Sequence, residues 1–286
     1  MDEKELTPDV LGLKDLAQFS SFFSTKIGKW VGEKLFHLFK IDEINRNNVI
    51  LSPFPVEEVP DRMMKMFGVK VVVEGEENLD LLKDTGFFSV SNHPFGSIDG
   101  ITLTGLLLKH RKDAKVMVND ILMRISCLRD AFLGVTPQIG FKKNQTPSML
   151  GMRAILKHIR EGHPLGLFPA GAVSLYGKRD FIADRLWQPQ IIKLVQQYKR
   201  PVIPIFFHGY NSPYFYNLER IHIALRTLFL PRQLFSKDGF TLKISVGEPI
   251  SVEEQEQCSS VEELGLLLRR RTYLLSKDER LINSTE

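Results

Sequence analysis

His93 and Asp99 are the residues of this chain best suited to acid–base chemistry, and five residues separate them. A carboxylate this close to a histidine can accept the Nδ1–H of the imidazole and stabilise the imidazolium, which leaves the other ring nitrogen as a general base. The chain has no Gly-x-Ser-x-Gly elbow that would supply a serine nucleophile. Direct activation of an acceptor substrate is therefore the simpler chemistry. On spacing alone, a turn histidine at the end of a strand is an equally good interpretation.

The flanking sequence places this pair where α/β proteins bind ligands. Residues 86–91 predict an apolar strand, and residues 98–110 predict a helix. The pair therefore follows the carboxyl end of a strand and leads into a helix, which is the usual ligand position of an open α/β sheet.

The rest of the chain alternates between strand and helix patterns. Strands are predicted at residues 69–73, 114–118, 164–168, 202–207 and 241–246, and helices at 120–125, 149–161, 189–198 and 261–275. Ser260 to Glu263 matches a capping box in front of the last helix. We predict an α/β fold class with a mixed, partly parallel sheet flanked by helices.

A small helical amino-terminal region, residues 1–60, is expected before an α/β domain that spans residues 61–286. Thr7 predicts a helix start, residues 22–39 predict a longer helix, and the proline-bearing segment 47–60 predicts a connection. The longer helix has an apolar face that includes Ile27 and Trp30, with lysines largely on the other face. Packing on its own domain is the favoured interpretation, and a helix lying in a membrane interface is the alternative.

The composition is that of an ordinary soluble protein. The chain has 286 residues, of which 43% are hydrophobic and 25% charged, with a formal net charge of +4. This composition excludes disorder, collagen and coiled coil, and a mean hydropathy of −0.10 argues against a transmembrane bundle. The acidic start lacks a signal-peptide pattern, and no apolar run reaches the length of a membrane span. We expect a cytoplasmic protein, peripheral on the inner face of the cell membrane.

Three further motifs accompany the histidine–aspartate pair. They are Ile139-Gly140-Phe141-Lys142-Lys143, Phe168-Pro169-Ala170-Gly171-Ala172-Val173-Ser174 and the apolar strand Val202-Ile203-Pro204-Ile205. With Asn92-His93 and Asp99, they resemble the motifs of the glycerophospholipid acyltransferase superfamily, the enzymes similar to lysophosphatidate acyltransferase. The resemblance covers residues 69–250, about two thirds of the chain, and the four motifs occur in the family's order.

Two features depart from the common family pattern. The family has four residues between its histidine and aspartate, whereas this chain has five. Ala170 and Val173 stand where the common motif has Glu and Arg, which help to bind the phosphorylated acceptor in the glycerophosphate enzymes. The chain looks more similar to a bacterial branch often labelled hemolysin, which includes N-acyltransferases that begin ornithine-lipid or glycine-lipid synthesis.

The resemblance implies acyl transfer from an acyl thioester, on acyl carrier protein or coenzyme A, to an amine or hydroxyl of a membrane-lipid precursor. His93 is then the general base and Asp99 its orienting partner, with no acyl-enzyme. Backbone amides near Gly96 or Gly171 are candidates for binding the oxyanion. The expected substrate-binding residues are Asn92, Gly96, Phe141, Lys142, Lys143, Phe168, Pro169, Gly171 and Ser174. The expected partners are the acyl donor and a membrane lipid surface, with no cofactor, metal or nucleic acid.

Other functions stay open at this stage. A lysophospholipid or glycerol-3-phosphate acyltransferase would use the same motifs, and a non-catalytic lipid-binding, membrane-associated protein would use the same fold. A membrane-lysing toxin is disfavoured, because the chain lacks a signal-peptide pattern, a membrane span and long amphipathic strands. His208 and Arg185 are weaker site candidates, since a histidine at a strand exit is more often structural.

Overall fold

A seven-stranded sheet forms the centre of the protein within the part that the computed structural model describes, residues 9–12, 15–16, 21–135, 149–176, 180–221 and 223–284. Its strands are β1 (Lys70–Glu74), β2 (Phe88–Ser91), β3 (Lys115–Asn119), β4 (Phe132–Val135), β5 (Leu165–Leu167), β6 (Val202–His208) and β7 (Thr241–Val246), in the order β1-β7-β6-β2-β5-β3-β4. β6, β2, β5, β3 and β4 are parallel, whereas β7 is antiparallel to β6 and parallel to β1. The predicted mixed, partly parallel α/β fold is confirmed.

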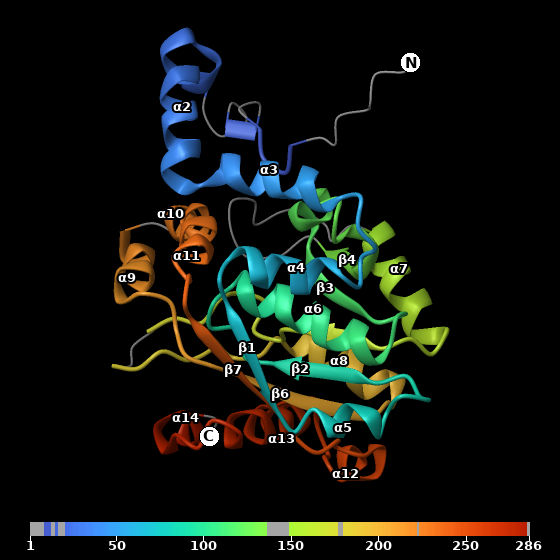
Figure 1. Cartoon of the computed structure of the whole chain (residues 1–286). Helices are drawn as coiled ribbons and strands as arrows, with labels where there is room; N and C mark the ends of the chain where they lie inside the picture. The colour runs from blue at the N-terminus through green and yellow to red at the C-terminus, as the bar shows by residue number, and fades with distance from the viewer. Residues whose placement is uncertain are drawn as a thin grey trace, which may run out of the picture.

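Helices cover both faces of this sheet (Figure 1). The larger ones in the α/β part are α4 (Val59–Met66), α6 (Ile98–His110), α7 (Met149–Arg160), α8 (Pro189–Tyr198) and α13 (Val261–Leu274). Alternate residues of β6 enter two cores: Ile205 lies in the core with α4 and α6, and Phe206 lies in the core with α7, α8 and α13. The period-2 alternation of a strand buried on both faces thus produces a three-layer arrangement.

The strand order determines which loops meet. β2 lies between β5 and β6, and all three run parallel, so their carboxyl ends share one edge of the sheet. The loop that carries His93 leaves β2 at this edge, the loop that carries Phe168 leaves β5, and Gly209 follows β6. Segments more than one hundred residues apart in sequence are therefore neighbours in space.

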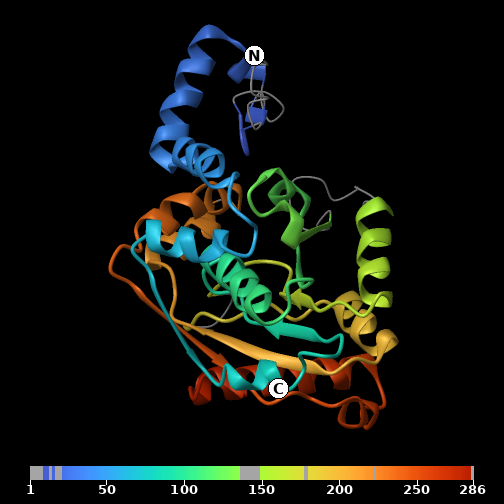
Figure 2. The same cartoon turned by 45° about the vertical axis from the view of Figure 1, so that its right-hand side comes forward.

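The amino-terminal helices lie away from the sheet (Figures 1 and 2). They are the short 3-10 helix η1 (Ser21–Ser24), α2 (Lys26–Phe39) and α3 (Ile41–Leu51). Phe39 contacts Phe229 with 5.0 Å between ring centroids, which joins α2 to the body. The helix start predicted at Thr7 lies outside the described residues. The predicted division at residue 60 stays a prediction.

Several elements were not expected from the sequence. They are α4, β4, α5 (Glu77–Asp80), α9 (Pro213–Ile221), α10 (Ile223–Leu228), α11 (Leu230–Phe235), α12 (Val252–Glu256), α14 (Glu279–Asn283), the 3-10 helix η3 (Arg129–Ala131) and the first half of α3. The segment expected as a connection from Asn47 is still helical to Leu51, because the first proline comes only at Pro53. The short helix predicted at 120–125 is a 3-10 helix, η2 (Asp120–Arg124).

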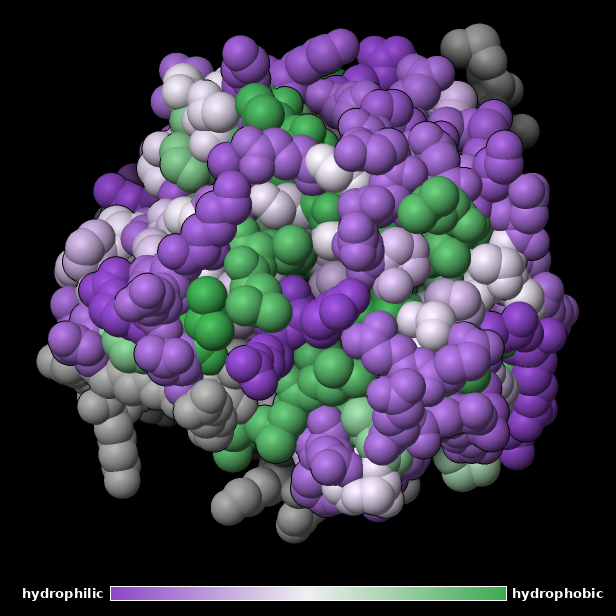
Figure 3. Space-filling view, turned by 90° about the horizontal axis from the view of Figure 1, so that it is seen from below, coloured by the Kyte–Doolittle hydropathy of each residue, from purple (hydrophilic) through white to green (hydrophobic). Residues whose placement is uncertain are grey.

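The end of the molecule opposite the amino-terminal helices is mostly hydrophilic. α12, α13 and α14 lie there, and the space-filling view from below shows small apolar patches between hydrophilic residues (Figure 3). Ser260 caps α13 by accepting a hydrogen bond from the Glu263 amide at 3.1 Å, as predicted. No helix among the described segments is both long and apolar enough to cross a bilayer.

We expect Leu103→Ala, in α6, to lower the free energy of unfolding by about 2–5 kcal/mol, because Leu103 has no exposed surface and its truncation leaves a cavity. Leu266→Ala, in α13, is the matched control, because Leu266 is 48% exposed. Urea unfolding followed by circular dichroism measures both. Equal destabilisation by the two variants would contradict the assigned core.

Candidate active site

His93 and Asp99 form a buried ion pair at the carboxyl end of β2. The Nδ1 atom of His93 lies 3.0 Å from Oδ2 of Asp99, and the two side chains are 15% and 0% exposed. The contact falls outside hydrogen-bond geometry in direction, although the distance is short. Catalytic hydrogen bonds are often poorly aligned before substrate binds. The structure thus brings together the two residues predicted as catalytic.

The carboxylate of Asp99 is surrounded by backbone donors. Oδ2 accepts hydrogen bonds from the amides of Phe95 at 2.9 Å and Gly96 at 3.1 Å, and Oδ1 accepts one from Gly100 at 3.0 Å. Asp99 also lies in the first turn of α6, where the helix dipole favours a negative charge. Burial by itself raises the pKa of Asp99, but the His93 charge and the backbone donors outweigh it and lower the pKa. The buried carboxylate therefore stays ionised.

His93 is a stronger base than an ordinary histidine. Burial lowers its pKa, but the charges of Asp99 and Asp184 act in the opposite direction, and the net pKa is raised. Because Nδ1 faces Asp99, Nε2 is the nitrogen left for proton transfer. This arrangement provides a general base whose protonated form is stabilised by carboxylates.

The extra residue between His93 and Asp99 is accommodated by a glycine turn. Gly96 has φ of +87°, a conformation that side chains rarely adopt. A Cβ atom there would lie 2.6 Å from Cδ2 of Leu230 and 2.7 Å from Cγ2 of Val173. The five-residue spacing is therefore compatible with the ion pair.

The region after β6 holds this loop in place through two residues, Asn211 and Tyr216, that were not among the predicted site residues. The Tyr216 hydroxyl, from α9, donates a hydrogen bond to the Pro94 carbonyl at 2.7 Å. The Asn211 side chain donates one to the Phe95 carbonyl at 2.9 Å. Both residues are buried. The sequence signal for Asn211 was its place in the segment from Phe206 to Tyr214, which resembles the same bacterial branch.

The motif after β5 packs directly on the base. The Phe168 ring lies 4.2 Å from the His93 ring, measured between centroids, and Phe168 is 8% exposed. The Ser174 amide donates a hydrogen bond to the His93 carbonyl at 2.9 Å. Pro169 is buried, and its carbonyl accepts a hydrogen bond from the Gln188 amide at 2.9 Å. Phe168 and Ser174 thus join His93 at the site.

Asn92 links strands. Its side chain donates to the Phe207 carbonyl at 3.0 Å and accepts from the Phe207 amide at 2.7 Å. The side-chain amide of Asn92 therefore connects the end of β2 to β6 through the Phe207 backbone. This contact explains why an asparagine precedes the histidine.

The two glycine amides suggested for the oxyanion already have partners. The Gly96 amide donates to Asp99, and the Gly171 amide donates to the Phe168 carbonyl at 2.9 Å. Gly171 has φ of +65°, and a Cβ atom there would lie 1.8 Å from Nε2 of Gln188. Gly171 therefore shapes the turn after β5.

Asp184 is a site residue that sequence reasoning missed. It is 4% exposed and lies in the loop before α8, where its Oδ1 accepts hydrogen bonds from the His93 amide at 3.1 Å and the Ser174 hydroxyl at 2.5 Å. The available signal was an aspartate inside the apolar stretch from Phe181 to Trp187. Because Asp184 lies ninety-one residues from His93 in the sequence, the contact could not be predicted from spacing.

The remaining candidates include three residues that the structure does not describe. Phe141, Lys142 and Lys143 fall outside the described residues. His208, at the end of β6, contacts the Ser245 hydroxyl at 2.8 Å through Nε2, which ties β6 to β7. The Arg185 carbonyl accepts a hydrogen bond from Arg269 at 2.9 Å. In the described part of the chain, no three His, Cys, Asp or Glu side chains gather in a way that could hold a metal ion.

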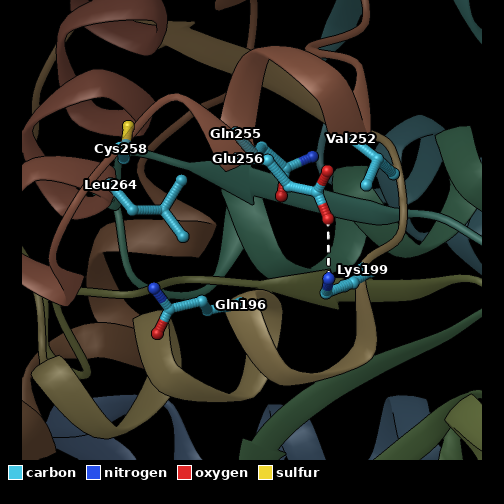
Figure 4. A pocket seen from close by; sticks show the side chains of 7 residues that line it. All are labelled: Gln196, Lys199, Val252, Gln255, Glu256, Cys258 and Leu264. Carbon is cyan, nitrogen blue, oxygen red and sulfur yellow. Dashed lines mark hydrogen bonds and ion pairs between the residues drawn. The ribbon is translucent and has the colours of Figure 1, made fainter.

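A separate cavity of about 190 Å³ lies between α8, α12 and α13 (Figure 4). Gln196 and Leu264 line it, and the ion pair of Lys199 with Glu256, 2.6 Å between Nζ and Oε1, closes one side. None of its lining residues belongs to the site around His93.

Two curated relatives are similar to this chain. The Lyso-glycine lipid O-acyltransferase of Bacteroides thetaiotaomicron is 32% identical over 195 residues, covering 65% of this chain and 68% of the relative. The protein of the same name from Phocaeicola vulgatus is 28% identical over 263 residues, covering 86% of this chain and 89% of the relative.

A solved structure shares the fold. The 1-acyl-sn-glycerophosphate (LPA) acyltransferase PlsC from Thermotoga maritima superposes with a TM-score of 0.50 over 96% of this chain and 93% of the other. At 17% identity this likeness concerns the fold alone.

A family match covers most of the chain. Residues 22–280 match the sequence model of the family described as Acyltransferase. The match agrees with the resemblance to the glycerophospholipid acyltransferase superfamily and with both curated relatives. The chain therefore belongs to the acyltransferase family and is an acyltransferase.

Proposed function

We propose that this acyltransferase moves a fatty acyl group from a thioester donor to the hydroxyl of a lyso-glycine lipid or a similar lipid acceptor, with His93 as general base. The observation that carries the proposal is the buried ion pair at the end of β2, with 3.0 Å between His93 Nδ1 and Asp99 Oδ2. The names of the two curated relatives support a lipid acceptor and an oxygen as the acylated atom. Transfer to an amine has less support.

The chemistry needs no covalent enzyme intermediate. His93 Nε2 takes the acceptor's hydroxyl proton while the hydroxyl oxygen attacks the thioester carbonyl carbon. The tetrahedral intermediate then collapses, the carbon–sulfur bond breaks, and the imidazolium returns the proton to the leaving thiolate. Asp99 stays ionised throughout and stabilises the imidazolium. The products are the acylated lipid and the free thiol of acyl carrier protein or coenzyme A.

Two apolar positions favour this acceptor over a phosphoglycerol. Ala170 and Val173 are 1% and 9% exposed and stand where the common family motif has charged residues. Neither side chain can pair with a phosphate. The intact pair of His93 and Asp99 likewise favours an enzyme over a non-catalytic lipid-binding protein.

We expect purified protein to acylate lyso-glycine lipid in preference to lysophosphatidate or glycerol 3-phosphate when supplied with acyl carrier protein or coenzyme A thioesters.

His93→Ala should lower kcat by at least about 100-fold, because the general base is lost. His163→Gln is the control, since His163 precedes β5 at the opposite edge of the sheet. Product formation is measured by lipid mass spectrometry. Full activity of His93→Ala would overturn the mechanism, and preference for lysophosphatidate would overturn the acceptor.

The rate should depend on pH through His93. Because the pKa of His93 is raised and the neutral form is the base, kcat/KM should fall as pH drops through a midpoint above 6.5, the ordinary histidine value. Asp99→Asn removes the stabilising charge, so this midpoint should move to lower pH while kcat falls about 100-fold. A pH–rate profile of both proteins checks this. A wild-type midpoint below 6.5 would contradict the electrostatics.

We also propose that α2 holds the protein on the inner face of the cell membrane. The buried positions of α2 are mainly glycines, Gly28 and Gly32, whereas Ile27 is 70% and Trp30 is 60% exposed. The Lys34 ammonium lies 5.9 Å from the Trp30 ring centroid, so positive charge accompanies the apolar surface. Trp beside Lys on an exposed helix suits an anionic lipid interface. α2 projects from the end of the molecule opposite α13 (Figure 1).

Ile27→Glu combined with Trp30→Glu should therefore abolish cosedimentation with vesicles that contain anionic phospholipid, because apolar contact is replaced by repulsion. Leu266→Glu is the control, because Leu266 is 48% exposed but lies on α13. Retained binding of the α2 double variant would exclude α2 as the membrane contact.

A further inference from the structure

A second buried carboxylate, that of Asp184, contacts His93 through its backbone amide. Besides the contacts of its Oδ1 with His93 and Ser174, the Oδ2 of Asp184 accepts a hydrogen bond from Nε1 of Trp187 at 3.3 Å. The Ser174 amide in turn donates to the His93 carbonyl at 2.9 Å. One carboxylate therefore ties the loop after β2 to the loop after β5.

α13 holds the backbone of this carboxylate from behind. Arg269 donates a hydrogen bond to the Asp184 carbonyl at 3.1 Å, and the Tyr273 hydroxyl lies 3.0 Å from the Asp184 amide, which donates to it. Both α13 residues are buried. Asp184 is thus fixed to a helix that packs under β2 and β6. These hydrogen bonds fix the position of the Asp184 backbone.

We propose that Asp184 is a positioning residue of the acyltransferase site, which fixes the backbone of His93 and the hydroxyl of Ser174 and adds a second negative charge beside the imidazole. Asp99 faces the ring, whereas Asp184 acts through the backbone and through its field. The role in turnover rests on the proposed function of His93, but the charge effect does not.

Several charged or titratable groups face this site and influence the ionisation of its buried residues. They are Asp99 from α6, Asp184 from the loop before α8, Arg226 from α10, Arg269 and Tyr273 from α13, Tyr216 from α9 and Lys237 in front of β7. Burial lowers the pKa of His93, Asp99 and Asp184 raise it, and Arg226 lowers it. Burial also raises the pKa of Asp184, and the hydrogen bonds from the Ser174 hydroxyl and the His93 amide act in the opposite direction. Removing one carboxylate should therefore make His93 easier to deprotonate.

The test must separate charge from packing. Asp184→Asn keeps an oxygen for His93 and Ser174, but its NH2 group then faces the Trp187 Nε1–H, donor against donor. Trp187→Phe removes that donor. The informative comparison is the double variant Asp184→Asn/Trp187→Phe against Trp187→Phe alone, in the full chain. Asp184→Ala is less useful because it leaves buried donors without a partner.

The primary readout is the titration of the His93 ring by NMR on protein with isotope-labelled histidine, with His93→Gln identifying the signal. We expect the midpoint of the double variant to lie at lower pH than that of Trp187→Phe. In turnover assays, the acid limb of kcat/KM should move in the same direction and kcat should fall roughly 10-fold, with KM unchanged.

An identical His93 midpoint in the two folded variants would overturn the proposal and reduce Asp184 to a packing residue. Because the NMR titration needs no substrate, a wrong acceptor assignment would leave this result intact. A shifted midpoint with unchanged kcat would also overturn the positioning role. If the double variant does not fold, Ser174→Ala serves instead, because it removes one hydrogen-bond donor to the Asp184 carboxylate. This variant should shift the same His93 midpoint, and an unchanged midpoint would count against the proposal.

Discussion

Burying an ionised carboxylate beside a histidine is costly unless other groups replace its lost hydration, and the site of this acyltransferase is organised around that requirement. Asp99 has no exposed surface. Three backbone amides, the amino terminus of α6 and the imidazole of His93 compensate its charge. These groups all lie within the segment from His93 to Gly100, so the loop between His93 and Asp99 must keep a single conformation. The positive φ of Gly96 and the contacts from Asn211 and Tyr216 maintain it.

The parallel strands bring the motifs of the site close together in space. β2 lies between β5 and β6, so the motifs that follow these strands meet at one edge without long connections. Asn92 joins β2 to β6, while Ser174 and Asp184 join the loops after β2 and β5. Residues of the acyltransferase motifs therefore serve structure as well as chemistry. The placement of His93 depends on each of these contacts.

The amino-terminal helices carry the exposed apolar surface on which the proposed membrane contact rests. A core of ordinary composition needs no exposed tryptophan, yet α2 presents Ile27 and Trp30 to solvent while its glycines pack inward. Gly28 is closely packed, since a Cβ atom there would lie 1.8 Å from the Phe22 carbonyl oxygen. The glycines allow this close approach, and Ile27, Trp30 and Leu38 stay exposed while Phe39 is buried against Phe229. The apolar stripe predicted from the sequence is thus divided between internal packing and an exposed surface.

The sequence by itself determined the α/β class, the strands that bear the candidate site and the choice of His93 and Asp99 as a pair. It could do so because strand periodicity and the spacing of a motif are local properties. Only the tertiary structure decided that Asp184 joins the site, that Asn92 links strands and that Asn211 and Tyr216 hold the loop. These contacts span ninety or more residues and depend on the order of strands in the sheet. Short elements such as β4 and α9 to α11 also escaped detection, because few residues and interrupting Gly or Pro leave little periodicity. The choice between a packed and an exposed face of α2 likewise required knowing which helices approach it.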